Sequence, residues 1–151
     1  MKLNIEQTLE KAITAHQEEK FEEAERLYVS ILKVEPQHSN VHNNLANIKA
    51  HHSKFEDAIA GYMKAIELKP NYVEAYNNLG IIQYQINRKE EAEISFKKVI
   101  KLIPNLAEAY YNLGVVYQEV DKLEKAETNY RKAIKLKPNL GEAHTNLASI
   151  Q

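Results

Sequence analysis

The four prolines of this 151-residue chain follow one another at intervals of 34 residues, at positions 36, 70, 104 and 138. A fixed period of this length is typical of proteins that stack one short supersecondary unit several times. Each repeat in such a protein buries its apolar surface only against its neighbours, so one architecture runs through the whole chain. The even spacing also indicates that nothing is inserted between the repeats. The sequence therefore predicts a repeat protein before any single motif is considered.

Alignment on the prolines gives four full repeats and a partial fifth. They span residues 5–38, 39–72, 73–106, 107–140 and, for the partial repeat, 141–151. Position 8 of each repeat is Ala or Gly, and position 20 of each full repeat is Ala. Position 24 is aromatic in every full repeat, with Tyr28, Tyr62, Phe96 and Tyr130. We expect the small residues to let two helices approach closely while the aromatic ring fills the space beside them.

The apolar positions of a repeat follow a helical period. Positions 4, 7, 8 and 11 form one stripe, and positions 20, 24, 27 and 28 form a second, which predicts two amphipathic helices per repeat. Ser53, Asn87 and Asp121 at position 15 suit the turn between them. The proline ends the second helix, because it lacks a backbone donor and restricts the residue before it. The fold class is therefore all-α.

The start of a repeat carries a possible capping motif. Asparagine stands three residues before a glutamate in the pairs Asn71 and Glu74, Asn105 and Glu108, and Asn139 and Glu142. An asparagine at the N-cap followed by an acid three residues later is close to a capping box. We therefore expect these asparagines to cap the first helices of their repeats.

Together these residues resemble the tetratricopeptide repeat family over residues 5–151. Departures from the family pattern are local: position 4, often Trp in the family, is Thr, His or Tyr here, and the Tyr of position 11 is kept only as Tyr117. The resemblance implies a single domain, residues 1–151, folded as an α-solenoid. It would be a right-handed superhelix of four helix-turn-helix repeats plus one terminal helix. In the family the first helices line a concave side, so positions 2, 6, 9 and 13 would face the groove.

Position 6 is asparagine in all repeats but the first, which has Glu10: the residues are Asn44, Asn78, Asn112 and Asn146. Asparagine is a mediocre helix former, so local propensity does not favour it there. Its amide offers donors and an acceptor, which suits the backbone of an extended peptide. The pattern resembles the asparagine ladder in the repeat region of the O-linked N-acetylglucosaminyltransferases, where the ladder holds peptide main chain. Nearby contacts would come from Asn43, Asn47, Asn77, Tyr84 and Tyr111. Alternatively, the asparagines bond to one another between neighbouring helices.

The charges on the same stripe bear on the partner. Position 2 carries Glu74, Glu108 and Glu142, and the stripe lacks the cations with which some members of the family clamp an acidic C-terminal tail. We expect the groove to prefer neutral or basic segments. With 20 basic and 21 acidic residues, the chain has no charge excess that would attract nucleic acid or a membrane surface. The sequence shows neither a signal peptide nor an apolar span, so the expected location is the cytoplasm.

Catalytic chemistry is not indicated. The chain has no cysteine and four glycines, and it lacks a phosphate-binding loop or a nucleophile motif. His16 and His51 could approach each other, but two imidazoles without a third ligand make a poor zinc site. We therefore expect no catalytic residue, metal or cofactor. The leading interpretation is a non-catalytic scaffold that binds a protein or peptide. The alternative is the substrate-presenting N-terminal arm of a larger glycosyl-, sulfo- or methyltransferase.

The last repeat stops at Gln151, within its first helix. Stacks of this kind need polar terminal caps, and no second helix follows here to cover the apolar side of the last one. Two explanations stay open. Either the chain is the N-terminal part of a longer protein, or the open end associates with a second copy.

Overall fold

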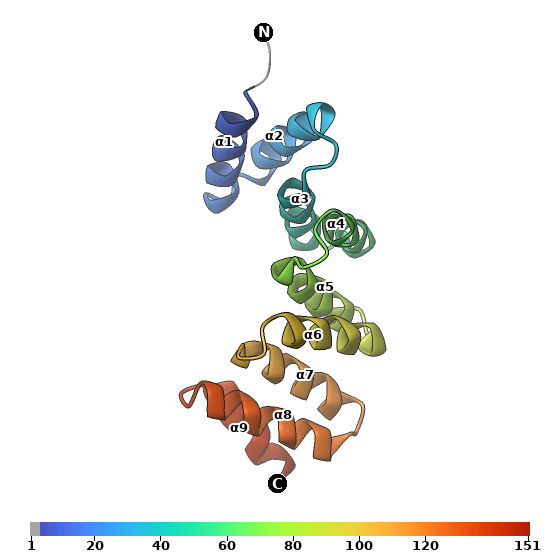
Figure 1. Cartoon of the computed structure of the whole chain (residues 1–151), viewed down its shortest axis with the longest axis vertical. Coiled ribbons are helices and arrows are strands. Elements are labelled where there is room, and N and C mark those ends of the chain that lie inside the picture. The colour runs from blue at the N-terminus through green and yellow to red at the C-terminus, as the bar shows by residue number, and fades with distance from the viewer. Residues whose placement is uncertain (1–3) are drawn as a thin grey trace. The chain divides into compact units, whose positions relative to one another are not determined.

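A computed structural model describes residues 4–151, which form nine helices and no strand (Figure 1). The helices are α1 (Ile5–Gln17), α2 (Phe21–Val34), α3 (Ser39–His51), α4 (Phe55–Leu68), α5 (Val73–Gln85), α6 (Lys89–Leu102), α7 (Ala107–Glu119), α8 (Leu123–Leu136) and α9 (Gly141–Ile150). Every first helix begins at the first residue of its repeat, and every second helix begins at the seventeenth. The expected all-α fold of four helix pairs plus a terminal helix is confirmed. Within the described residues, no helix is both long and apolar enough to span a membrane.

The turn inside each pair lies at position 15, as expected. Glu19, Ser53, Asn87 and Asp121 have backbone φ angles of 58°, 58°, 65° and 58°. These are left-handed values, which reverse the chain sharply and let the second helix return along the first. The backbone N–H groups that follow bond back to the first helix; that of Lys54, for example, donates to the carbonyl of Lys49 at 2.8 Å.

The turn between repeats differs from the prediction. The backbone N–H of Leu106 donates to the carbonyl of Ile103 at 3.3 Å, so Pro104 and Asn105 are the two central residues of a β-turn. Equivalent bonds close the turns at Lys69–Tyr72, at 3.0 Å, and at Lys137–Leu140, at 3.1 Å. The asparagine thus lies one residue earlier than the capping motif requires.

The N-caps of α7 and α9 are Leu106 and Leu140, and neither makes a side-chain capping bond. The expectation that Asn105 and Asn139 cap these helices is therefore wrong. Leu140 is only 8% exposed and packs with Ala133 and Ala143. At this cap position the leucine side chain packs against the preceding helix. Burial of its apolar surface thus stabilises the start of α9 in place of a capping hydrogen bond.

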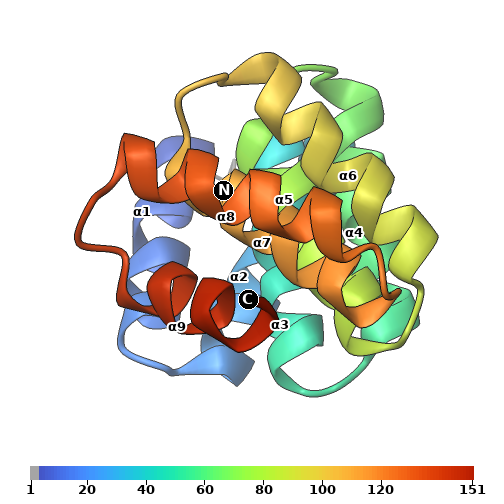
Figure 2. The same ribbon diagram turned by 90° about the horizontal axis from the view of Figure 1, so that it is seen from below.

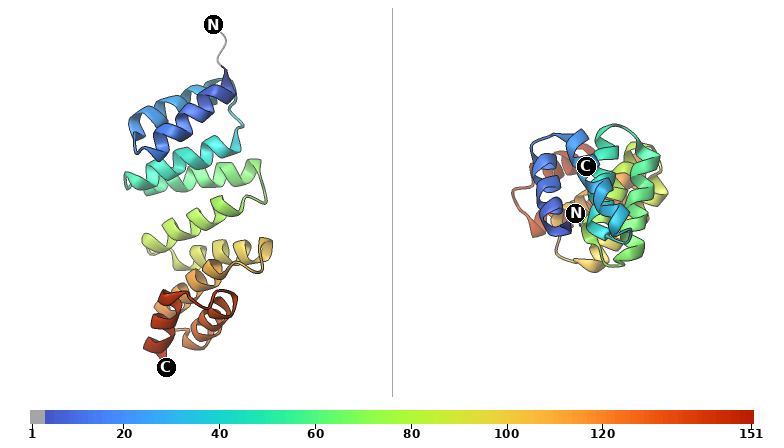
Figure 3. Two further views of the ribbon diagram at one scale, coloured as in Figure 1. Left: turned by 90° about the vertical axis from the view of Figure 1, so that its left-hand side faces the viewer. Right: turned by 90° about the horizontal axis from the view of Figure 1, so that it is seen from above.

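The described residues fall into two compact units, divided between Ala75 and Tyr76. In the N-terminal unit, residues 4–75, α1 packs on α2, α2 on α3 and α3 on α4 (Figures 1 and 3). Its core joins alanines of positions 8 and 20 to the ring of Tyr28: the buried cluster is Ala12, Ala15, Ala24, Tyr28, Ile31, Val41 and Ile48.

The C-terminal unit, residues 76–151, repeats this arrangement. Helix α6 packs on α7, α7 on α8, and α8 on α9, whose adjacent positions are visible in Figure 2. Its buried cluster is Ala92, Phe96, Leu113, Val116, Tyr117, Ala126 and Tyr130. The expected close approach at position 8 is confirmed, since a Cβ atom on Gly114 would lie 2.7 Å from the ring of Tyr130.

Candidate functional site

The tyrosine at position 24 of one repeat holds the asparagine at position 6 of the next. The hydroxyl of Tyr28 accepts a hydrogen bond from Nδ2 of Asn44 at 3.2 Å. In the C-terminal unit, the hydroxyl of Tyr130 accepts one from Nδ2 of Asn146 at 3.3 Å. Both tyrosines are fully buried. Two of the four asparagines of the predicted ladder are therefore bonded to core hydroxyls.

The same hydroxyls also reach the first helix of their own repeat. That of Tyr62 donates to Oδ1 of Asn47, and that of Tyr130 donates to Oε1 of Gln118, both at 2.7 Å. In the first repeat, the hydroxyl of Tyr28 lies 3.5 Å from Nδ1 of His16. Asn47, a predicted peptide contact, thus serves as an acceptor for a buried tyrosine.

The third repeat lacks this hydroxyl, because its position 24 is Phe96. The ring of Phe96 is 2% exposed and lies against Gly80, just as Tyr130 lies against Gly114. Nδ2 of Asn112 instead lies 3.5 Å from Oδ1 of Asn77, at the outer limit of a hydrogen bond. The alternative of bonding between asparagines of neighbouring helices therefore occurs here, in a weak form.

A depression of about 450 Å³ opens beside Phe96 and Asn112. It is lined by residues of α5, α6 and α7: Ile81, Tyr84, Gln85, Phe96, Tyr111, Asn112 and Val115. We call it the Phe96 pocket. The structure thus brings together three predicted site residues, Tyr84, Tyr111 and Asn112, and the contact with Asn112 places Asn77 next to them.

Sequence reasoning missed the other residues of the pocket, which are Ile81, Gln85, Phe96 and Val115. Ile81, Val115 and Gln85 occupy positions 9 and 13 of the stripe expected to face the groove, so the periodicity already contained them. Phe96 could have been found as the single phenylalanine among three tyrosines at position 24. The phenylalanine is visible in the sequence, but what distinguishes this repeat is the hydroxyl oxygen that phenylalanine lacks.

Of the two pocket tyrosines, Tyr84 lies near a carboxylate, that of Glu119. Burial raises the pKa of Tyr84, and the nearby Glu119 and Tyr111 raise it further, so the hydroxyl stays protonated at neutral pH. Glu119 forms an ion pair with Lys89 at 3.4 Å and remains half-exposed. Neither α5, α7 nor α9 contains a lysine or an arginine. The basic residues within helices of the C-terminal unit all lie on α6 and α8.

Asn43, predicted as a ligand contact, lies in the core. Its side chain is 0% exposed, and its Nδ2 donates to Oε1 of Glu74 at 3.0 Å. Its Oδ1 has no partner among the described residues. A partner therefore cannot touch Asn43 unless the helices around it rearrange. Asn78 lies partly buried on α5 and is also engaged in an interaction.

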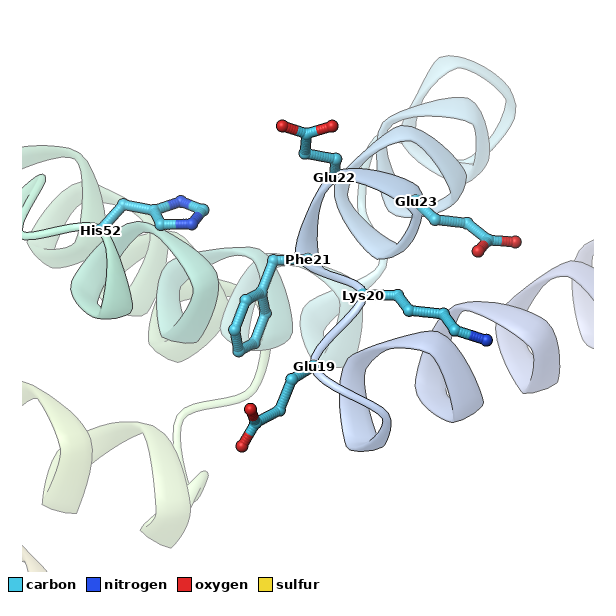
Figure 4. Close-up of a pocket in the computed structure, with 6 residues that line it drawn as sticks. All are labelled: Glu19, Lys20, Phe21, Glu22, Glu23 and His52. Carbon is cyan, nitrogen blue, oxygen red and sulfur yellow. The ribbon is translucent and has the colours of Figure 1, made fainter.

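A second depression, of about 480 Å³, lies in the N-terminal unit at the turn between α1 and α2. Figure 4 shows its lining side chains pointing in different directions, with Glu22 and Glu23 on opposite sides of the helix start. The ring of Phe21 lies 4.2 Å from that of His51, measured between centroids. No group of three potential metal ligands occurs in residues 4–151. This depression has no convergent polar groups, and we place the candidate site at the Phe96 pocket.

Comparisons with known proteins agree with this architecture. A family model described as the tetratricopeptide repeat matches residues 73–106 and 107–140, and a second, described as the TPR repeat, matches residues 52–87. The first matches coincide with the third and fourth repeats. No curated protein sequence matches the chain.

Several solved structures are similar. A MamA crystal structure is 28% identical, with a TM-score of 0.86 over 92% of this chain and 81% of that one. MamA from Desulfovibrio magneticus RS-1 (residues 41 to the end) is 23% identical, with a TM-score of 0.91 over 99% and 85% of the two chains. The first TPR domain of Spaghetti (RPAP3), bound to the HSP90 peptide SRMEEVD, is 24% identical, with a TM-score of 0.72 over 74% and 89%. The last two likenesses concern the fold alone.

Proposed function

Because the chain belongs to the tetratricopeptide repeat family, we propose that it is a non-catalytic scaffold that binds an extended segment of a partner protein against its first helices. The observation that carries the proposal is the Phe96 pocket. There apolar side chains, two tyrosines and an amide whose one contact among the described residues is weak line the same depression on α5, α6 and α7. Such a mixture of apolar surface and few oriented polar groups is typical of ligand sites.

Charge supports a neutral or basic partner. The first helices of the C-terminal unit carry Glu108, Glu119 and Glu142 and no basic residue. The HSP90 peptide bound by the RPAP3 domain, SRMEEVD, has three acidic residues among its last four. Glu108 and Glu119 already pair with Lys137 and Lys89, so a lysine or arginine of the partner would gain a modest attraction and an acidic segment a modest repulsion.

The test is a titration of peptides that differ only in charge. A dodecapeptide selected from a random display library on the folded chain would be synthesised with either two lysines or two glutamates at its ends. We expect the basic form to bind about three- to fivefold more tightly at low salt, because exposed charge pairs contribute up to about 1 kcal/mol. High salt should shrink the difference.

The matched control is Glu119→Gln, which keeps the shape of the side chain and removes its charge. This variant should lose part of the preference for the basic peptide and bind the unmodified peptide as the wild type does. Tighter binding of the acidic form would contradict the proposed preference. Failure of the library to yield any binding peptide would contradict the proposed function itself.

A further inference from the structure

We propose that the Phe96 pocket is an anchor site for one bulky aliphatic side chain of an extended partner segment, and that Asn112 holds the peptide bond beside that side chain. The inference rests on the proposed function and adds where along the repeats recognition occurs and what chemistry is recognised. The third repeat is selected because position 24 carries a phenylalanine there in place of a tyrosine.

The first argument concerns the amide of Asn112. In the pairs Tyr28–Asn44 and Tyr130–Asn146, a buried hydroxyl already takes a hydrogen from the asparagine amide. Asn112 has no such hydroxyl and makes a 3.5 Å contact to Asn77. Replacing so long a contact by a well-formed bond to a carbonyl oxygen gains more than it loses. Asn112 is therefore better prepared to bind a ligand than Asn44 or Asn146.

The second argument concerns the floor of the pocket. In the other repeats the hydroxyl has a polar partner on its own first helix, which is Asn47 at position 9 or, at position 12, His16 or Gln118. The third repeat has Ile81 and Tyr84 at these positions. Loss of the hydroxyl thus goes together with loss of its acceptor, and an apolar surface is left. Binding of an aliphatic side chain there lowers the free energy, since its atoms leave water and no hydrogen bond of the protein is displaced.

The third argument concerns the arrangement of polar groups around this floor. Asn112 and Gln85 lie among the lining residues together with Ile81, Phe96 and Val115. An amide offers a carbonyl acceptor and two donors, so it can pair with both groups of a peptide unit. In an extended segment, successive side chains point to opposite sides, so one can enter the pocket while its peptide groups stay at the edge. An extended peptide with an aliphatic residue therefore fits this site.

The deciding experiment is the substitution Phe96→Tyr, which adds a single oxygen atom at the pocket. By analogy with Tyr130 and Asn146, the new hydroxyl should bond the amide of Asn112 and make the floor polar. The probe is the library-selected dodecapeptide, measured by isothermal titration calorimetry with the full chain. We expect its affinity to fall about tenfold, the equivalent of one lost hydrogen bond. Thermal unfolding should show that the variant is as stable as the wild type.

Two further variants control the result. Asn112→Ala should weaken the same peptide by a similar factor, and this variant carries the test if Phe96→Tyr folds poorly. Tyr28→Phe makes the reverse exchange in the first repeat and should leave the affinity within about twofold, since this hydroxyl is not among the groups that line the pocket. Replacement of the enriched aliphatic residue of the peptide by alanine should abolish most of the binding.

The outcomes separate the two proposals. A peptide that binds equally well to wild type, Phe96→Tyr and Asn112→Ala overturns the anchor site and leaves the scaffold function standing. Selection of peptides that lack an aliphatic residue overturns the anchor site as well. If no peptide is selected, the scaffold function fails and the anchor site fails with it.

Discussion

Phe96 and Tyr130 lie on equivalent glycines, Gly80 and Gly114, and their rings fill the same space between two helices. In these two repeats the ring packs closely against a residue that has no side chain. The hydroxyl then decides what else the ring does. On Tyr130 it joins Gln118 to Asn146, whereas Phe96, which lacks it, lines a pocket.

The substitution Gly114→Ala tests this close packing. The added Cβ atom would lie 2.7 Å from the ring of Tyr130, so ring or helix must shift. We expect the free energy of unfolding to fall by up to about 2 kcal/mol, because an overpacking cost of about 1–3 kcal/mol is partly offset by the gain of about 1 kcal/mol that alanine has over glycine inside a helix. Urea unfolding followed by circular dichroism measures it. Gly141→Ala is the control, because no atom lies within 4 Å of its Cβ position, and it should be neutral or slightly stabilising.

At this scale the sequence predicted part of the site. Tyr84, Tyr111 and Asn112 were expected at the groove, and they line the pocket. The sequence could not show that Asn44 and Asn146 are engaged, because their partners belong to the preceding repeat and are defined by packing between helices. Asn43 was misassigned for the same reason: the helical period puts it beside Asn44, but it is buried against Glu74.

Helices and turns were predicted more closely than side-chain contacts. All first helices start where the repeat alignment places them, since one period determines every boundary in the chain. The exception is the cap of α7 and α9, which lies one residue later than expected, at Leu106 and Leu140, and Leu140 is buried against Ala133 and Ala143. A short motif such as Asn-x-x-Glu indicates the capping hydrogen bond but does not show that packing against another helix competes with it.

The left-handed residue in the turn of each helix pair predicts how substitutions there change the stability of the fold. Glu19 has a left-handed backbone, with φ at 58°, a conformation that costs an ordinary residue about 1 kcal/mol or more and costs glycine almost nothing. We expect Glu19→Gly to raise the free energy of unfolding by about 0.5–1 kcal/mol after the entropy cost of glycine is subtracted. Asn87→Gly is the matched control, because asparagine already tolerates this conformation, and it should change little. An equal gain in both variants would contradict the explanation.

Across the whole molecule, ionisable residues are unevenly distributed. Residues 1–75 contain twelve acidic and nine basic residues and five of the six histidines, whereas residues 76–151 contain nine acidic and eleven basic residues and one histidine. Among the histidines, His16 is partly buried, with its ring against those of Phe21 and Tyr28. The two units should therefore respond differently to acid.

Burial and the neighbouring His51 lower the pKa of His16 below its ordinary value of 6.5. The unfolded chain then takes up a proton more readily than the folded one, so the stability of the N-terminal unit should fall as the pH drops through about 6.5. Methyl signals of Ile48 and Val116, followed in urea at about pH 7.5 and 5.5, report on the two units. The Ile48 midpoint should fall more, and His16→Gln should remove most of the difference. Equal decreases in both signals would exclude this role of His16.

The exchange of tyrosine for phenylalanine at position 24 has a consequence for how such a protein evolves. All repeats share one backbone plan, so the location of an opening depends on which repeat lacks the hydroxyl and its acceptor. Two substitutions, one at position 24 and one at position 9 or 12, would close the opening in one repeat or create it in another. If the proposed anchor site is correct, such changes would move it along the chain in steps of 34 residues, with neither insertion nor loss of the stack.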